Sequence, residues 1–333
     1  MNTLPDSVQA AIDEMMQGVS ANKLAAVREK LTAFYKEERV EAKGLNVLES
    51  LDEHLAYLAF RLPATYAALF EVFGRVKEYL PDNVIHSLVD IGAGPGTAFL
   101  AASYYFEELQ EACLVERDAQ FITLGKKLIS ALAIPCAVKW QEQDLKAYTS
   151  DSSFDLSVLS YSLGELSASL FEQLLITLVE KTKKLIVIVE PGTMHGYETI
   201  IRARTQLIAM GGKVIAPCPH QRACPIQKGD WCHFSCRLPR SRLHRAIKLG
   251  SLGYEDEKFS YLVVALQHIK QAPYDRIIRR AHHGSGFAKF TLCSHEGVLE
   301  QKTISRRDKE SYALAKKAEW GDSLPVHSTE VES

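Results

Sequence analysis

Residues 88–97 read LVDIGAGPGT, and this stretch decides the fold. An apolar run ends in a turn with three glycines, and a segment of helical character follows. Glycine lets the backbone turn tightly and approach a ligand closely, because it has no Cβ atom to clash. The spacing differs from the G-x-G-x-x-G of dinucleotide folds, since the third glycine comes one residue early and Thr97 stands in its place. The stretch predicts a ligand-binding turn and argues against NAD.

The pattern D-x-G-x-G-x-G is similar to the cofactor loop of class I methyltransferases. In those enzymes the turn accommodates the methionine and ribose parts of S-adenosylmethionine. The resemblance implies that Gly92, Gly94 and Gly96 contact this cofactor. It also implies that Asp90, at the strand end, contacts an ammonium group or a bridging water.

The chain around this turn alternates short apolar runs with helical segments. The runs are HSLVDIG (86–92), EACLVER (111–117), CAVKW (136–140), FDLSVLS (154–160) and KLIVIVEPG (184–192). Buried short runs alternating with helices indicate βαβ units and a parallel sheet covered on both faces. The predicted class is α/β, a Rossmann-like class I S-adenosylmethionine methyltransferase fold.

Further segments are expected before, within and after this core. Helical spacing predicts an N-terminal helical region over 1–80, with Pro63 as a helix start or break. The Rossmann core covers 81–213 and 246–270, and an irregular Cys-rich metal-binding segment covers 214–245. The strand FSYLVVALQ follows that segment, and 271–333 form a β hairpin with a HEG turn and a tail.

Polar residues follow the later strands where a cofactor would need them. Glu116 ends the second apolar run, where a carboxylate can accept both ribose hydroxyls. Asp144 comes after the third, where the adenine edge would lie, and Ser160 comes after the fourth. Taken singly, each acid could also be a solvated loop residue or a helix cap. The ordered set favours the cofactor site.

The catalytic residues stay unknown. Base amino-methylation uses Asn/Asp-Pro-Pro-aromatic after the fourth strand, whereas residues 160–166 read SYSLGEL. Cys136 follows a proline but lies near strand three, the wrong place for a cytosine-C5 nucleophile. Positioning alone can still contribute strongly to a methyl transfer.

Four of the seven cysteines crowd into 19 residues with the spacing C-x5-C-x7-C-x3-C, at Cys218, Cys224, Cys232 and Cys236. Clustered cysteines in a reducing compartment are more often metal ligands than disulfides. Structural zinc favours a tighter knuckle, whereas iron–sulfur clusters tolerate wider spacing and often have proline beside a ligand. An iron–sulfur cluster is expected, with zinc or a set of free thiols as the alternatives. His220 and His233 are alternative zinc ligands, or neighbours of the site.

Composition bounds the class of protein. The 333 residues are 47% hydrophobic and 24% charged, with a net charge of −2, so any contact with RNA must come from local basic clusters. The N-terminus shows no secretory signal, and no apolar stretch is long enough to cross a bilayer. We expect a monomeric cytoplasmic protein with no membrane contact.

Several blocks resemble the small-ribosomal-subunit methyltransferase-like family, which comprises bacterial proteins and related mitochondrial assembly factors. The blocks are RLPATY (61–66), VDIGAGPGTA (89–98), EPGT (190–193), CPH…DWCHF (218–234) and C…EG…AKKAEWGD (293–322). The resemblance covers about 50 to 322 and implies maturation of the small subunit through its rRNA. Members are often described as rRNA methyltransferases.

The resemblance also implies a ligand set. Mitochondrial relatives hold a [4Fe-4S] cluster with three cysteines of the segment and a distant fourth. Matched by motif, these are Cys218, Cys224, Cys232 and Cys293. Cys236 falls where relatives often have Gln, although spacing alone would make it the fourth ligand.

Two basic stretches are candidate rRNA contacts. Residues 237–248 contain no acid and carry Arg237, Arg240, Arg242 and Arg245. A second set follows at Arg276, Arg279, Arg280, His282 and His283. The alternative for either stretch is a solvated face.

Three functions compete. One is an active S-adenosylmethionine-dependent rRNA methyltransferase. Another is a catalytically inactive assembly factor that uses the fold and metal cluster to bind rRNA. The third is a small-molecule methyltransferase, which would not need the arginines.

Overall fold

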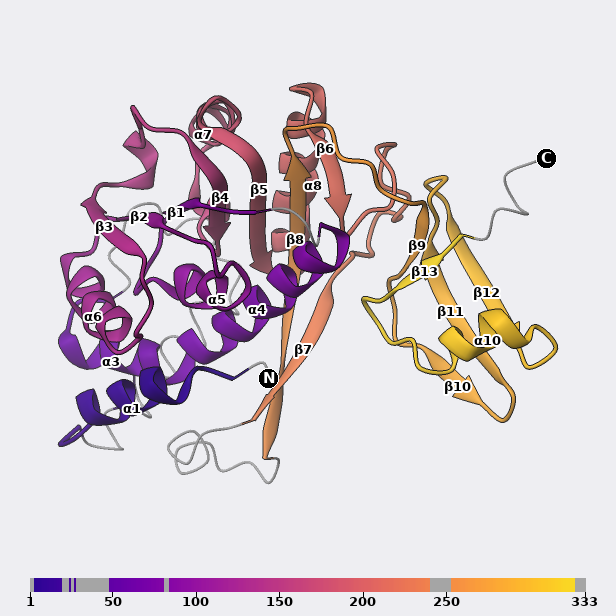
Figure 1. Cartoon of the computed structure of the whole chain (residues 1–333), viewed down its shortest axis with the longest axis horizontal. Helices are drawn as coiled ribbons and strands as arrows, with labels where there is room; N and C mark the ends of the chain where they lie inside the picture. Colours follow the sequence, from indigo (N-terminus) through magenta and orange to yellow (C-terminus); the bar gives the residue numbers. More distant parts are fainter. Residues whose placement is uncertain are drawn as a thin grey trace. The chain divides into compact units, whose positions relative to one another are not determined.

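The computed structural model describes residues 3–19, 24, 27, 48–80, 84–239 and 253–326. The chain divides into two compact units, which are described separately (Figure 1). One unit comprises Met1–Thr182 with Cys236–Glu257, and the other comprises Lys183–Ser235 with Lys258–Ser333. The four segments expected from the sequence have other boundaries and stay a prediction.

The first unit is built on four parallel strands in the order β3-β2-β1-β4. They are β1 (Ser87–Ile91), β2 (Glu111–Glu116), β3 (Ala137–Glu142) and β4 (Phe154–Ser160). All five residues of β1 are buried. Burial on both faces explains why the central strands read as continuous apolar runs. The strands occur where the apolar runs predict them.

Helices connect and flank these strands. Three follow strands in the chain: α5 (Thr97–Tyr105), α6 (Ala119–Ser130) and α7 (Ala168–Lys181). Before β1, the elements that can be described over their full length are α1 (Asp6–Met15), α3 (Leu51–Phe60) and α4 (Leu62–Tyr79). Pro63 lies in the first turn of α4, where its missing N–H costs no intrahelical hydrogen bond. It starts a helix, which is one of the two roles expected of it.

The second unit contains strands β5 (Thr182–Pro191) and β6 (Lys213–Ala216), which both pair antiparallel with β8 (Tyr254–Ala265). Helix α8 (Met194–Ala209) connects β5 to β6. A parallel set of strands with crossover helices, followed by antiparallel strands, is the mixed arrangement of a Rossmann-like methyltransferase fold. The α/β class is confirmed.

The segment expected to be irregular contains a strand, β7 (Phe234–Pro239), which pairs with β8. Its burial alternates, with Phe234, Cys236 and Leu238 buried. This period of two is the mark of a strand with one covered face. The expectation of irregular structure over 214–245 was wrong here, because the density of Cys, Pro and Arg obscured the alternation.

A separate sheet forms the C-terminal part of the second unit. Its strands are β9 (Tyr274–Ile277), β10 (His282–Gly284), β11 (Phe287–Cys293), β12 (Leu299–Ser305) and β13 (Ser323–Pro325). Strands β11 and β12 form the expected hairpin around the HEG turn. Helix α10 (Lys309–Ala315) packs on them (Figure 1).

None of the helices in the described ranges is both long enough and apolar enough to cross a bilayer.

Candidate functional site

The glycine turn after β1 depends on a backbone conformation that other residues seldom adopt. Gly92, Gly94 and Gly96 have φ of 76°, 54° and 85°. A Cβ at Gly92 would lie 2.9 Å from the Cβ of Ser162, whereas a Cβ at Gly94 would meet open space. The middle of the turn therefore has room for a ligand beside the backbone.

Asp90 is a buried carboxyl group next to this turn. It is 0% exposed, and neither of its oxygens has a hydrogen-bond partner among the described residues. Burial, with a smaller contribution from Glu116, raises the pKa of Asp90 to about 8. A buried polar group without a partner is costly. Asp90 thus lacks a donor that a bound ligand could supply.

Glu116 is held by backbone amides at the end of β2. Its Oε2 accepts from the Gly94 N–H at 2.7 Å, and its Oε1 accepts from the N–H groups of Arg117 and Asp118 at 2.8 and 2.9 Å. Burial raises the pKa of Glu116, and these amide hydrogen bonds oppose the rise. Each carboxylate oxygen has two lone pairs, so these three amides leave one lone pair, on Oε2, that can accept from a hydroxyl group.

The other two predicted cofactor residues have local partners or lie at the margin. Asp144 caps a short 3-10 helix, η1 (Leu145–Ala147), by accepting from the Lys146 N–H, and forms an ion pair with Arg117 at 3.3 Å. Ser160 is half-buried at the end of β4. The contacts show that Asp144 caps a helix, which is one of the alternatives that the sequence left open.

Ser162, which lies against the turn, was not among the site residues predicted from the sequence. Its Oγ donates to the Ile91 carbonyl at 3.3 Å, and its Cβ faces Gly92. The preceding Tyr161 has φ of 57°, and no other non-glycine residue in the described ranges has a positive φ. This turn out of β4 delivers Ser162 to Gly92. Only its position directly after a strand could have signalled the role.

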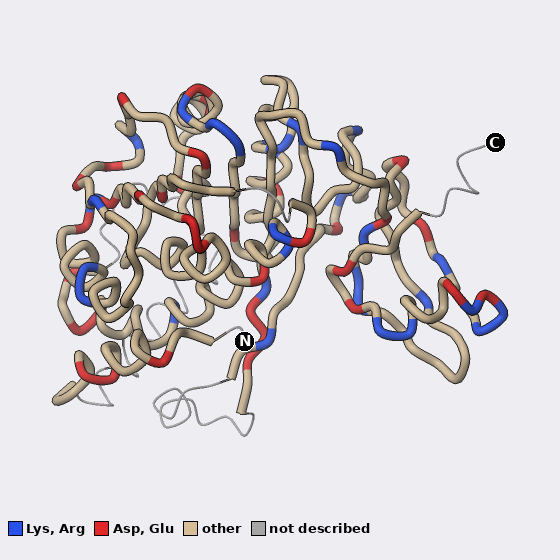
Figure 2. The backbone as a smooth tube through the Cα atoms, viewed as in Figure 1, with Lys and Arg blue, Asp and Glu red and all other residues tan. Residues whose placement is uncertain are grey.

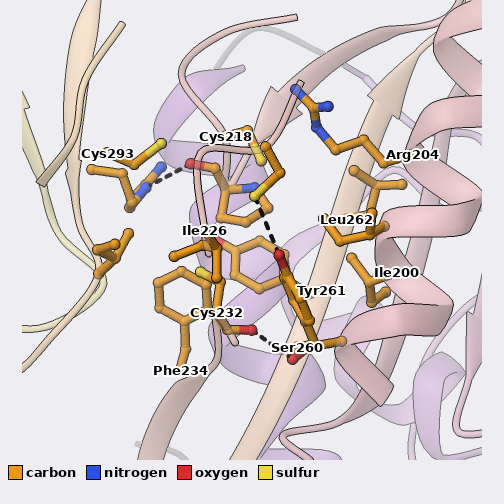
Figure 3. A pocket seen from close by; sticks show the side chains of 16 residues that line it. Ile200, Arg204, Cys218, Ile226, Cys232, Phe234, Ser260, Tyr261, Leu262 and Cys293 are labelled. Atoms are coloured by element: carbon orange, nitrogen blue, oxygen red, sulfur yellow. Dashed lines mark hydrogen bonds between the residues drawn. The ribbon is translucent and has the colours of Figure 1, made fainter. Parts of the chain in front are cut away.

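Four cysteines from distant parts of the second unit line one small cavity that is partly open to solvent (Figure 3). Cys218 follows β6, Cys224 and Cys232 lie in the following loop, and Cys293 ends β11. Burial raises the pKa of Cys232 well above its ordinary value, and the neighbouring thiols Cys218, Cys224 and Cys293 raise it further. The four cysteine side chains therefore line the same cavity.

Cys236 has different surroundings. It is buried in strand β7 and belongs to the first unit. Burial is the main cause that raises the pKa of Cys236, and the charge of Glu257 is the second. No other thiol is among the causes. Within the described residues, no three His, Cys, Asp or Glu side chains are arranged as a metal site. Cys218, Cys224, Cys232 and Cys293 thus line one cavity, but their side chains do not have the arrangement of metal ligands.

Polar side chains surround the four thiols. The Tyr197 hydroxyl lies 3.4 Å from Cys224 Sγ, and His220 Nε2 lies 3.4 Å from Cys293 Sγ. The Arg204 guanidinium is buried and donates to the carbonyls of His220 and Arg222, both at 2.8 Å. The loop that carries the cysteines is therefore fixed from α8. His233 instead stacks on Trp231, 5.5 Å between centroids.

The basic stretches differ from what the sequence suggested. Arg276 is fully buried and donates to the Pro217 carbonyl at 2.9 Å, so its expected place on an exposed RNA face was wrong. Arg279 forms an ion pair with Asp230 at 2.6 Å. The strand register turns Arg276 inward, and sequence spacing alone could not show this.

Arg237 is exposed but paired, since it contacts Asp256 at 2.7 and 3.1 Å and lies 3.9 Å from the centre of the Tyr254 ring. Figure 2 shows acidic and basic residues mixed along β7 and β8. Arg240, Arg242 and Arg245 lie outside the described residues. Their role stays a prediction.

The family profile described as "Mitochondrial small ribosomal subunit Rsm22" matches residues 51–325. The chain belongs to the Rsm22 family. The human mitochondrial ribosome assembly protein METTL17 is 27% identical to this Rsm22-family chain, over 89% of the chain and 66% of the human protein. Rsm22-cox11 tandem protein 2 of Schizosaccharomyces pombe is 26% identical, over 82% of the chain and 43% of that protein. The chain thus spans under two thirds of the length of these relatives.

Solved methyltransferase structures are more distant. The magnesium protoporphyrin IX methyltransferase of Synechocystis PCC 6803 with bound SAH is 11% identical, covers 73% of this chain and 99% of its own, and has a TM-score of 0.40. The ribosomal protein L11 methylase of Lactobacillus delbrueckii subsp. bulgaricus is 13% identical, covers 61% and 79%, and has a TM-score of 0.38. Nothing about function follows at these scores.

The raised pKa of Asp90 gives a testable pH dependence of the ligand-free protein. Between about pH 4 and 8 the folded state keeps a proton on Asp90 that the unfolded state loses, so the free energy of unfolding falls as the pH rises. In Asp90→Asn this part of the fall is absent. We measure the free energy of unfolding in urea at pH 5, 6.5 and 8. The stability of the Asn variant relative to the wild type should increase with pH. Parallel curves for the two proteins would contradict the assignment.

Proposed function

We propose that this protein is an S-adenosylmethionine-binding, methyltransferase-like factor that assists assembly of the small ribosomal subunit. The match to the family over residues 51–325 supports the ribosomal role, since two relatives are named ribosome assembly proteins. The small-subunit rRNA is the proposed partner. A small-molecule methyltransferase does not account for this membership.

The residues around the glycine turn fit S-adenosylmethionine. The orphaned carboxyl of Asp90 needs a donor, which an ammonium group or a bridging water would provide. The open space at Gly94 leaves room for the cofactor against the backbone. Glu116 keeps one lone pair on Oε2 for a ribose hydroxyl. When bound, the cofactor would supply an electrophilic methyl group.

An assembly role without methyl transfer is supported by the segment after β4. Tyr161 donates to Glu257 Oε1 at 3.2 Å, and Ser162 donates to a backbone carbonyl. Burial raises the pKa of Tyr161 well above its usual value, so its phenol does not serve as a base at neutral pH. These hydrogen bonds give the segment a structural task, and no general base or nucleophile is assigned.

The four cysteines of the cavity fit a thiolate-held group. Four thiols that line one cavity, with no carboxylate among its lining residues, are the donor set of an iron–sulfur cluster or of structural zinc. The resemblance to relatives with a [4Fe-4S] cluster favours the cluster, and the wide loop spacing agrees with it. Cys218, Cys224, Cys232 and Cys293 would hold the cluster, which would link the loop after β6 to β11.

The ribosomal role is tested by co-sedimentation of the purified full chain with small subunits on sucrose gradients. We expect the chain in the small-subunit fraction, with little in the large-subunit fraction, because the proposed partner is small-subunit rRNA. Equal distribution between the two subunits, or none with either, would contradict the proposal.

Cofactor binding is tested by isothermal titration of S-adenosylmethionine into the metal-loaded protein. Asp90→Ala removes the carboxyl, and Gly94→Val places a branched side chain in the open space with a strained φ. We expect each change to weaken binding about tenfold or more, as for loss of a charge-assisted hydrogen bond. Asp151→Asn, on an exposed loop residue, is the control and leaves the affinity unchanged. Absence of binding to the wild type would reject the cofactor site.

The thiol site is tested by iron, sulfide and zinc content per chain after anaerobic purification. Cys293→Ser should lose the metal, because Cys293 lines the cavity. Cys236→Ser should keep the metal, because the neighbours of Cys236 are charged residues such as Glu257 and not the other thiols. Retained iron in Cys293→Ser with loss in Cys236→Ser would reverse the assignment. One zinc per chain without sulfide would reject the cluster and keep the thiol site.

A further inference from the structure

The C-terminal sheet has two chemically different faces, which the strand register defines. Directly paired residues of antiparallel strands point to the same side. One set of pairs joins Ala288 to Ile304 and Leu292 to Glu300. The other joins Lys289 to Thr303 and to His282. Burial along β11 alternates with these two sets.

The first face is covered. Its apolar residues form a buried cluster with residues of α10 and of the segment after it, and this cluster is the core of the C-terminal part. Its members are Ile277, Ala288, Phe290, Leu292, Ile304, Ala315, Ala318 and Leu324. The sheet therefore already has its hydrophobic support, and the second face is not needed for folding.

The second face is open and carries no carboxylate within β10, β11 and β12. His282, Lys289, Gln301 and Thr303 are exposed there, and Phe287 is half-buried. Gln301 donates to the Thr291 hydroxyl at 2.9 Å, which continues the neutral polar surface along the strands. The face thus combines an aromatic ring, a cation and neutral hydrogen-bonding groups.

Phe287 is the centre of this open face. Its ring lies over Gly284, where a Cβ would come within 2.3 Å of a ring atom, so the ring rests on bare backbone. The Lys289 ammonium lies 5.6 Å from the ring centre, and the His282 ring lies 6.0 Å away. The ring is held in place by its neighbours, and a planar group could stack beside it.

The open face ends at the cysteine cavity. Cys293 belongs to the same set of positions as Phe287, Lys289 and Thr291, and it pairs with Arg276 and Leu299. Both Cys293 and Arg276 line the cavity. Any loss of the thiol site would therefore disturb the edge of this face.

We propose that the open face of β10, β11 and β12, centred on Phe287 and Lys289, binds single-stranded RNA. Unpaired bases stack on aromatic rings, and basic side chains contact the phosphates. Duplex RNA offers no such exposed base faces. A protein partner would call for an interface core that is more apolar and less charged. The assignment rests on the proposed ribosomal function and names the RNA-contacting surface within it.

The test measures binding of the full-length, metal-loaded chain to a fluorescent single-stranded RNA of about 12 nucleotides, a length within the usual site size. A duplex of the same length is measured in parallel, and both titrations are repeated at several salt concentrations. The variants are Phe287→Leu, which keeps an apolar cover over Gly284, and Lys289→Gln. Lys309→Gln is the matched control, because Lys309 is exposed at the start of α10, which packs on the covered face.

We expect Phe287→Leu to weaken single-strand binding by roughly tenfold, because a stacking platform is lost. Lys289→Gln should reduce the slope of log affinity against log salt by about 0.7, the effect of one lost phosphate contact. Lys309→Gln should change neither. Iron content and thermal unfolding of each variant show that the fold is kept.

Unchanged affinity and slope in both variants, or no RNA binding by the wild type, would overturn the inference. A stronger preference for the duplex would do the same. If the variants bind RNA normally but lose co-sedimentation with the small subunit, the face binds protein and the RNA assignment is wrong. Absence of co-sedimentation in the wild type overturns the ribosomal function itself, so the two failures are distinguishable.

Discussion

Arg276 is fully buried in the second unit, and its guanidinium donates to the carbonyls of Pro217 and Gly321. These two carbonyls lie just before the first cavity cysteine and just before strand β13. A buried cation is tolerated only when its donors are satisfied, so the guanidinium fixes both segments at once. The cysteine loop and the C-terminal sheet are therefore held in one arrangement before any metal binds.

The first unit shows the opposite situation, since one of its buried groups has no partner. Asp90 is enclosed beside the glycine turn with both oxygens unsatisfied among the described residues. Glu116, one strand away, is supported by three amides. An acid held by the backbone next to an orphaned acid is consistent with a site that is completed by a ligand.

The open face of the C-terminal sheet would give a ribosomal factor a local surface for RNA, which its net charge of −2 does not provide. One cation beside an aromatic ring, with no acid on the same face, is a local binding surface in a chain without a basic excess. Arg237 cannot play this part in the same way, because Asp256 neutralises it. Local arrangement, more than total charge, decides where RNA can bind.

The sequence by itself determined the parallel strands and the turn at Gly92, because apolar runs and glycines act through local backbone sterics and burial. It also marked the cysteine segment. The family resemblance already pointed to Cys293 rather than Cys236, and the tertiary structure shows that Cys293, but not Cys236, shares a cavity with the loop cysteines. Only the tertiary structure decided that Arg276 points inward and that Ser162 lies against Gly92. Strand register fixes the side of the sheet on which Arg276 lies, and a one-residue change of register would reverse it, whereas the turn at Tyr161 places Ser162.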